Sequence, residues 1–253
     1  MKKIKNYSAS ILIIGNEILS GKTQDKNIKF IAERCNLIGI QIKEVRIIED
    51  IKAEIINNIK YLSEYSDHVF TTGGIGPTHD DITAESVAKA LGKKLVLNRF
   101  AYKQLKDYFE RSKIEFNKSR VKMAYIPSNS YLIKNPVSIA PGFRIKNVWV
   151  MAGVPKIMQA MFLEGVEPKI IKGSPIYSKN IKIFVPEGEI AETLENMQFK
   201  FSDITIGSYP FFKPPNVGTV VVCRGANYKI IQEAIKLLCK SLSKANIQFL
   251  RED

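Results

Sequence analysis

The sequence predicts a three-layer α/β/α domain with a doubly wound, mostly parallel sheet, followed by a second, smaller α+β domain. Two observations favour this fold class. The apolar run at residues 9–14 stops at Gly15, as expected for a strand covered on both faces of its sheet. Strand and helix patterns then alternate along the first part of the chain, which is the order found in doubly wound folds.

The first part of the chain contains three predicted strands, each followed by a helix. The strands are residues 9–14, 40–48 and 68–72. Asp25 and Asp50 are placed to cap the first two helices, and Thr83 is placed to cap the third. Apolar residues recur at helical spacing after each cap, and Gly39 and Gly92 are placed to end the first and third helices.

Shorter elements complete the first domain, which we expect to cover residues 1–172. Residues 98–124 carry the alternating charges of an exposed helix face. Pro155 suits the first turn of the domain's last helix. Between these two regions, three short strands are predicted at residues 131–133, 143–145 and 148–152.

A change in composition near Gly173-Ser174-Pro175 marks the second domain, residues 173–253. Its predicted order is strand, helix, strand, strand, helix, with the helices at residues 188–198 and 228–245. Residues 211–216 contain two adjacent phenylalanines, and we expect them to form a loop between two strands.

The glycine-rich segment after residue 70 carries the strongest functional signal. Gly73, Gly74 and Gly76 follow a predicted strand and precede a predicted helix. Glycines allow positive φ values, so that successive backbone N–H groups can converge on an anion. A helix N-terminus also favours negative charge. The segment therefore predicts a phosphate-binding loop.

Two adjacent acids in this loop point to a metal. Asp80 and Asp81 would repel a phosphate unless a cation lay between them. Magnesium binds one or two carboxylates together with substrate phosphate oxygens. We therefore expect a divalent metal, magnesium, held by Asp80 and Asp81. The alternative is that one aspartate caps the helix and the other is solvated.

A third acid, Glu17, follows the first strand. Ligands of such sheets bind outside the carboxyl ends of the strands. The loops at residues 15–21 and 72–81 should therefore share one rim of the sheet. Glu17 could hold the water ligands of the metal or accept a proton, and the alternative is a salt bridge at the end of the strand. We place Asp81, Asp80 and Glu17 in the catalytic site.

Hydroxyls, amides and tight turns supply the remaining candidates at this rim. Threonine hydroxyls and loop N–H groups could donate to phosphate, whereas Ser20 and Asn27 could bind a pterin, base or ribose. The candidate phosphate- or nucleotide-binding residues are Thr72, Gly73, Gly74, Gly76, Thr78, Gly15, Asn16, Ser20, Asn27, Pro141, Gly142, Gly153 and Pro155. His79 has no paired nucleophile in the sequence, so covalent catalysis is disfavoured.

Residues 72–83 resemble the signature of the molybdenum-cofactor biosynthesis (MoaB/Mog-like, molybdopterin-binding) domain. They are most similar to the branch found in CinA proteins and at the N-terminus of eukaryotic FAD synthase. Other motifs of that branch resemble segments of this chain in the expected order, namely residues 15–21, Asn135 with residues 140–143, residues 153–155 and residues 206–210. The resemblance implies that the second domain is ferredoxin-like or KH-like.

The resemblance also implies a function. It favours metal-dependent hydrolysis of nucleotide diphosphate linkages of the ADP-ribose or FAD type. A non-catalytic molybdopterin- or nucleotide-binding protein and a molybdopterin adenylyltransferase are the alternatives. The chain departs from the CinA pattern in two places, since Lys156-Ile157 replaces the usual Ser-Glu and Lys26 replaces a Thr.

Composition limits the partners. The net charge is +13, but the lysines are scattered and no basic run contains interleaved aromatics, so nucleic acid is not expected. No apolar stretch is long enough for a membrane span. Three unclustered cysteines favour a reducing cytoplasm. We expect a small-molecule nucleotide or pterin phosphate as ligand and a homo-oligomer, dimer or trimer, as the assembly.

Overall fold

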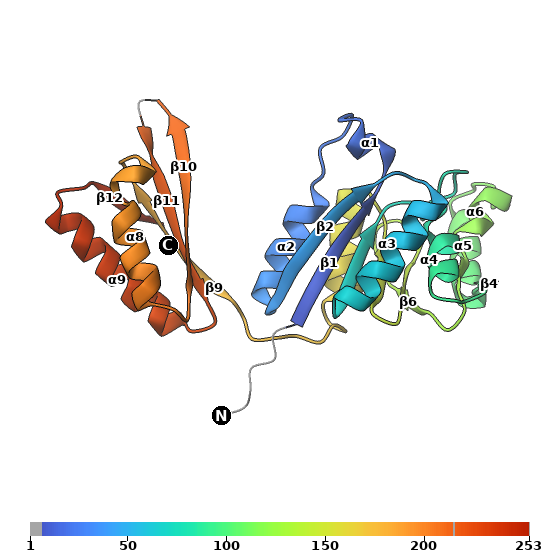
Figure 1. The fold of residues 1–253 in the computed structure, drawn as a ribbon. Helices are drawn as coiled ribbons and strands as arrows, with labels where there is room; N and C mark the ends of the chain where they lie inside the picture. The colour runs from blue at the N-terminus through green and yellow to red at the C-terminus, as the bar shows by residue number, and fades with distance from the viewer. Residues whose placement is uncertain (1–6, 215, 253) are drawn as a thin grey trace. The chain divides into compact units, whose positions relative to one another are not determined.

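The computed structural model describes residues 7–214 and 216–252. The described chain divides into two compact units. The first extends to residue 173 without residues 36–39, and the second contains those four residues and the chain from Ser174 onward. Figure 1 shows the elements of each unit.

A six-stranded sheet forms the centre of the first unit. Its strand order is β2-β1-β3-β8-β7-β6. The strands are β1 (Tyr7–Ile14), β2 (Ile40–Ile48), β3 (His68–Thr72), β6 (Tyr131–Ile133), β7 (Gly142–Ile145) and β8 (Val148–Met151). β2, β1, β3 and β8 are parallel, whereas β7 and β6 are antiparallel. Ile11 lies beside Phe70 and Ile13 beside Thr72, which confirms that the strands preceding the two predicted loops are neighbours.

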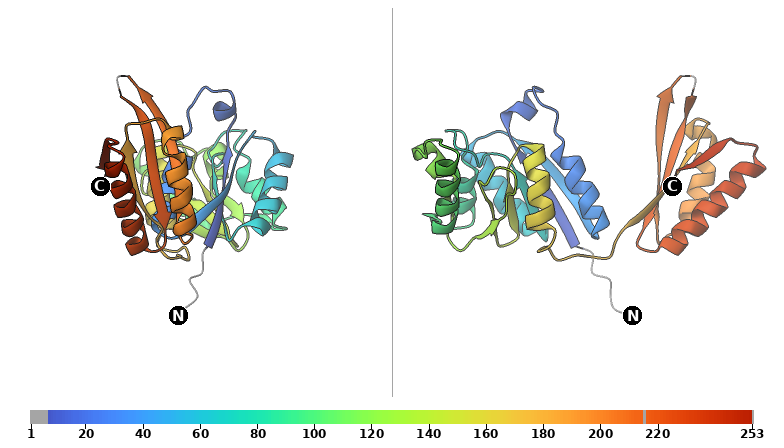
Figure 2. Two further views of the ribbon diagram at one scale, coloured as in Figure 1. Left: turned by 60° about the vertical axis from the view of Figure 1, so that its left-hand side comes forward. Right: turned by 180° about the vertical axis from the view of Figure 1, so that it is seen from behind.

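Helices cover both faces of this sheet. α2 (Asn27–Leu37) and α7 (Pro155–Met161) lie on one face, and α3 (Lys52–Tyr65) and α4 (Thr83–Ala90) lie on the other (Figure 2). On the α3 and α4 face, Leu12, Ile59 and Val87 belong to one buried core. On the opposite face, the rings of Phe70 and Phe162 are in edge contact. The three-layer prediction is confirmed.

The segment between α4 and β6 differs from the prediction. Residues 98–124 form two helices, α5 (Arg99–Arg111) and α6 (Lys118–Lys122), instead of one helical stretch. The side chains of Asn98 and Asn117 cap them by accepting hydrogen bonds from the N–H groups of Ala101 and Arg120. Two unpredicted strands, β4 (Leu95–Leu97) and β5 (Tyr125–Pro127), pair antiparallel beside these helices.

The second unit contains a four-stranded antiparallel sheet with the order β10-β11-β9-β12. Its elements are β9 (Tyr177–Ile183), α8 (Ala191–Lys200), β10 (Thr205–Lys213), β11 (Asn216–Gly225), α9 (Tyr228–Lys244) and β12 (Phe249–Glu252), with a 3-10 turn at Glu187–Glu189. This β-α-β-β-α-β connectivity is that of a ferredoxin-like unit.

The second unit differs from the sequence prediction in two places. Residues 211–213 continue β10 and Asn216 begins β11, so the predicted loop is a strand hairpin. Residue 215 of that segment lies outside the described residues. β12 was not predicted, and it pairs with β9 at the edge of the sheet.

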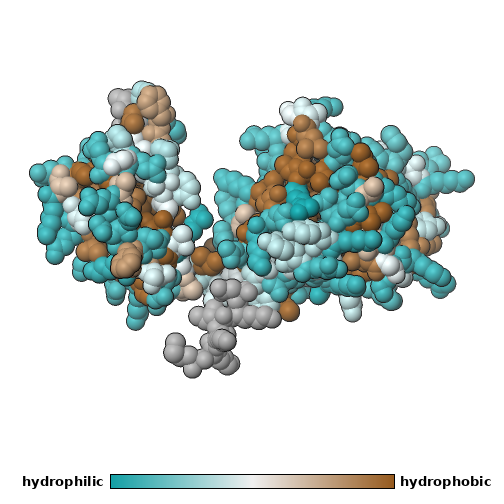
Figure 3. Space-filling view, viewed as in Figure 1, coloured by the Kyte–Doolittle hydropathy of each residue, from teal (hydrophilic) through white to brown (hydrophobic). Residues whose placement is uncertain are grey.

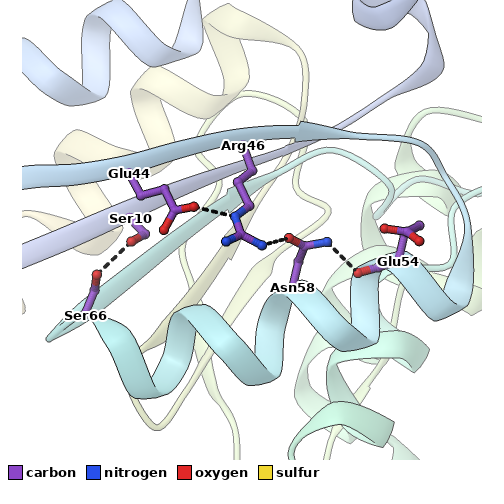
Figure 4. Close-up of polar contacts among 6 residues, drawn as sticks. All are labelled: Ser10, Glu44, Arg46, Glu54, Asn58 and Ser66. Atoms are coloured by element: carbon purple, nitrogen blue, oxygen red, sulfur yellow. Dashed lines mark hydrogen bonds and ion pairs between the residues drawn. The ribbon is translucent and has the colours of Figure 1, made fainter.

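Polar side chains fasten β2 to α3 (Figure 4). The guanidinium of Arg46 donates to Glu44 Oε1 at 2.6 Å and to Asn58 Oδ1 at 2.7 Å. The hydroxyls of Ser10 and Ser66 are hydrogen bonded at 2.7 Å. The Arg46–Asn58 contact joins β2 to α3, whereas the Ser10–Ser66 contact joins β1 to the end of α3.

Most of the surface visible in Figure 3 is hydrophilic, and apolar side chains gather in limited areas of each unit. Exposed apolar residues of the first unit include Val45 and Ile47 of the edge strand β2. No helix in the described part of the chain has the length and apolarity needed to cross a membrane.

Candidate functional site

A cleft with a volume of about 550 Å³ lies at the carboxyl ends of β1 and β3. This volume is in the range of pockets that hold small ligands and cofactors. The loops after β1, β3 and β8 all contribute to its lining. The predicted site residues that line the cleft are Gly15, Glu17, Asn27, Thr72, Gly73, Gly74, Gly76, Asp80, Asp81, Gly153 and Pro155.

The glycine-rich loop turns sharply at Gly73 and Gly74, whose φ values are +104° and +66°. A Cβ atom on Gly73 would lie 2.0 Å from the carbonyl oxygen of Ile14, so the loop packs directly on the end of β1. Gly76 was expected to share the positive φ, and it does not. It is instead needed for space, because a Cβ there would lie 2.7 Å from Asp81 Oδ2.

Several hydrogen-bond donors of this loop are used within the protein. The N–H of Gly73 donates to the carbonyl of Met151 at 3.2 Å and therefore belongs to the sheet. Thr78 was predicted to contact phosphate, but its N–H and hydroxyl both donate to Asp81 Oδ2, at 2.7 and 2.5 Å. Thr78 thus orients Asp81 and does not line the cleft.

Thr83 holds the far end of the loop, although it is not the predicted helix cap. Ile82 occupies the cap position of α4. The buried hydroxyl of Thr83 donates to the carbonyl of Gly73 at 3.0 Å, and its N–H donates to the carbonyl of Gly74 at 3.0 Å. Thr83 therefore closes the loop across its base, so that Asp80 and Asp81 face the cleft from a fixed frame.

The loop after β1 forms a short, unpredicted helix, α1 (Asn16–Leu19), which carries Glu17. Asp50 was predicted to cap α3, but its carboxylate accepts a hydrogen bond from the N–H of Asn16 at 2.9 Å. Ile51 is the cap residue of α3 and has no side-chain hydrogen bond. Asp50 lines the cleft as a further carboxylate beside Glu17, Asp80 and Asp81.

Negative charge accumulates on this side of the cleft. Burial raises the pKa of Asp50, and the neighbouring carboxylates raise it further, against the lowering effect of the Asn16 N–H. These carboxylates are those of Glu17, Asp80 and Asp81. Each stabilises a proton on Asp50, and each would equally favour a bound cation.

Asp80 has the opposite shift. The nearby Thr78 hydroxyl is the largest cause that lowers the pKa of Asp80, followed by the backbone N–H of Asp80 itself, and the charge of Lys122 lowers it as well. Within residues 7–214 and 216–252, no three His, Cys, Asp or Glu side chains form a metal site by themselves. A metal here would therefore share its coordination with ligand oxygens, as magnesium does on phosphates.

Asn27 joins three loops at the floor of the cleft. Its side chain is 3% exposed, and its Nδ2 donates to the carbonyl of Gly153 at 2.8 Å and to Thr72 Oγ1 at 3.4 Å. The sequence suggested that Asn27 binds a pterin, base or ribose. In the structure its side-chain N–H groups donate to protein atoms and so fix the relative positions of the loops after β3 and β8. Asp25 caps α2 as predicted, by accepting the N–H of Ile28 at 2.8 Å.

The two units match two known families. Residues 10–172 match the model described as "Probable molybdopterin binding domain", and residues 175–250 match the model described as "FAD synthase, middle domain". The chain belongs to the molybdopterin-binding-domain family. The resemblance seen in the sequence motifs is thereby confirmed.

Two relatives and one solved structure show which proteins this molybdopterin-binding-domain chain is similar to. A protein of Pyrococcus furiosus is 31% identical over 95% of this chain and 98% of its own length. A CinA-like protein of Sulfurihydrogenibium sp. is 35% identical over 75% of this chain, and the match covers 49% of that relative. The crystal structure of CinA, a protein with unknown function from Thermoplasma acidophilum, superposes with a TM-score of 0.59 and 35% identity, covering 62% of this chain and 95% of that one.

Four predicted residues besides Thr78 lie outside the lining of the cleft. Asn16 contributes its N–H to Asp50, and the hydroxyl of Ser20 donates to the carbonyl of Glu17 at 3.3 Å. Pro141 lines a separate hollow on the other side of the loop. Gly142 is buried in β7, where a Cβ would lie 2.2 Å from the carbonyl oxygen of Val150.

Sequence reasoning missed several residues that line the cleft, including Asp50, Asn135 and Ser138. Asp50 lies in the loop between β2 and α3, and its position after the carboxyl end of a strand could have identified it. Asn135 accepts hydrogen bonds from the N–H groups of Val137 and Ser138, both at 3.0 Å, and so shapes its own loop. Its motif was recognised, but no role was assigned to it.

Proposed function

We propose that this protein hydrolyses the diphosphate linkage of a nucleotide of the ADP-ribose or FAD type, with a divalent metal, magnesium, as cofactor. One observation carries the proposal. A glycine loop with positive φ at two positions delivers Asp80 and Asp81 to a cleft that Glu17 and Asp50 also line. A bound cation would offset the repulsion between these carboxylates and the two phosphates of such a ligand.

The donor set fits a magnesium ion. Carboxylate oxygens are the protein ligands that this ion prefers, and it commonly takes only one or two of them beside phosphate oxygens. Asp81 and Asp80 would hold it. A bound metal would offset phosphate charge and make its water more acidic.

The chain's own residues supply position and proton transfer. Thr78 donates two hydrogen bonds to Asp81 Oδ2, so Oδ1 is presented in one orientation. Glu17 lies on α1 at the opposite loop, where it would accept a proton from the attacking water. Gly74 and Gly76 bring backbone to the phosphates without a Cβ in the way. No nucleophilic side chain is required, since water is the attacking group.

A screen of nucleotides tests this proposal. Purified protein is incubated with ADP-ribose, FAD, dinucleotide polyphosphates and adenylylated molybdopterin, each with magnesium and with a chelator. We expect a nucleoside monophosphate product that the chelator abolishes. Tight binding of a pterin or nucleotide without product under every metal condition would favour a non-catalytic binding protein, which the family match to a molybdopterin-binding domain makes the second candidate.

A further inference from the structure

The sheet of the second unit carries both long helices of that unit on one face (Figures 1 and 2). Met197 of α8, Leu238 of α9 and Val221 of β11 share one buried core there. Neighbouring residues of a strand point to opposite faces. The face away from α8 and α9, the open face, therefore includes one row across all four strands, formed by Tyr209, Val220, Lys182 and Leu250.

Three aromatic side chains lie on the open face. The ring of Tyr209 lies over Gly207, where an added Cβ would be 3.4 Å from the Tyr209 hydroxyl. The ring of Phe211 lies over Gly218, where an added Cβ would be 2.8 Å from its Cζ. The ring of Phe184 meets Phe211 edge-on, with centroids 6.2 Å apart. Tyr209 is 52% exposed, and an exposed ring on a sheet offers a surface on which a base can stack.

Positive charge accompanies these rings. Lys182 Nζ lies 4.5 Å from the ring centroid of Phe211 and 5.7 Å from that of Phe184. Arg224 is exposed and lies four residues beyond Val220 on β11, which is about 13 Å along the strand. Both cations belong to the open face, because Val220 pairs with Lys182 and Arg224 lies on the same side of β11 as Val220. A chain of phosphates a few nucleotides long could meet both.

Acidic residues are largely kept away from this face. Between residues 174 and 251 they lie in the 3-10 turn, in the helices and in the loop after α8, namely Glu187, Glu189, Glu192, Glu195, Asp203 and Glu233. One acid belongs to a strand, Glu252 at the end of the edge strand β12, and its register partner is Asn180. Basic groups that are separated from acids in this way favour a polyanion.

We propose that the open face binds a single-stranded nucleic acid, with bases stacked on Tyr209 and Phe211 and phosphates beside Lys182 and Arg224. Unpaired bases stack in this manner on the sheet aromatics of RNA-recognition domains. The sequence predicted no nucleic acid because no basic run contains interleaved aromatics. The residues of the open face come from three strands, however, and only the sheet register brings them together. The site is independent of the proposed hydrolysis in the first unit.

Fluorescence anisotropy tests this inference on the whole chain, with a chelator present so that metal-dependent hydrolysis cannot act. The probes are labelled uridine and thymidine oligonucleotides of about ten nucleotides and a duplex of the same length. Tyr209→Ala removes the exposed ring, and Tyr209→Phe keeps it. Phe212→Ala is the matched control, since Phe212 is 76% exposed on the same strand but has the opposite side-chain direction.

We expect at least one of the single strands to bind more tightly than the duplex, because stacking needs unpaired bases. Tyr209→Ala should lose about tenfold in affinity, whereas Tyr209→Phe and Phe212→Ala should bind as wild type. Arg224→Gln should weaken binding and reduce the slope of log affinity against log salt by about 0.7. Lys240→Gln, at an exposed position of α9, should leave both unchanged.

Three results would overturn the inference. The wild-type protein fails to bind either single strand at low salt, the duplex binds as tightly as the single strands, or Tyr209→Ala and Arg224→Gln bind like their controls. The last result would assign the binding to the general positive charge of the chain. If the single strands do not bind and Tyr209→Ala changes the oligomeric state in light scattering, the open face is instead a contact between two copies of the chain.

Discussion

Replacement of Thr83 by valine should weaken both the fold and the activity, because Thr83 closes the base of the glycine loop. Its hydroxyl is fully buried and donates to the carbonyl of Gly73 at 3.0 Å. Valine has the same shape and no donor, so it leaves that carbonyl without its partner. The expected loss is about 1–3 kcal/mol in the free energy of unfolding. Turnover should also fall about tenfold, because the glycine loop that carries Asp81 is held less firmly.

Two variants make this a controlled measurement. Thr83→Ser keeps the donor and should lose only about 1 kcal/mol, the contribution of one buried methyl group. Thr71 is also fully buried, and its hydroxyl has no hydrogen-bond partner among the described residues, so Thr71→Val should not destabilise the protein. Urea unfolding and steady-state turnover are measured for all three. The reasoning is refuted if Thr83→Val is as stable and as active as Thr71→Val.

Three further predictions concern other sites. Gly73→Ala should destabilise the protein by about 2–4 kcal/mol in thermal unfolding, because position 73 has a positive φ and the new Cβ would collide with the carbonyl oxygen of Ile14. An unchanged melting temperature would contradict this. The pKa of Asp50 is raised in the folded protein, so ionisation of this carboxyl group opposes folding. Asp50→Asn should therefore be more stable than wild type at pH 7, and the difference in free energy of unfolding should disappear below about pH 4. A difference that stays constant in unfolding curves across pH would contradict this. Burial raises the pKa of the Cys35 thiol to about 12 and that of Cys223 to about 11, so iodoacetamide at pH 8 should label neither in the folded protein, as mass spectrometry would show.

The sequence predicted the central sheet because its strands carry an unmistakable signal. Every residue of the run at 9–14 is buried, and so is every residue at 68–72. The edge strands β4 and β12 were missed, since both are short and β4 is exposed along its whole length. Alternation of apolar and polar residues cannot mark such strands.

The sequence predicted which loops meet at the cleft, but not the hydrogen bonds within it. The order of strands brings Glu17, Asp80 and Asp81 to one cleft, and that order follows from the alternation of elements. The caps assigned to Asp50 and Thr83 were wrong because tertiary partners took their place. Asp50 bonds to Asn16 and Thr83 to Gly73, over separations of 34 and 10 residues, and local helix rules do not contain such partners.

The magnesium dependence of Asp81→Asn tests the central claim most directly. Asparagine keeps an oxygen that can accept from Thr78, but it removes the charge that would hold the cation. Turnover of the best nucleotide substrate should fall about a thousandfold, with a higher magnesium requirement, because the metal supplies several kcal/mol of charge stabilisation. Asp107→Asn, at an exposed position of α5, is the control and should behave as wild type. Near-normal turnover of Asp81→Asn with an unchanged magnesium dependence would contradict the proposed mechanism.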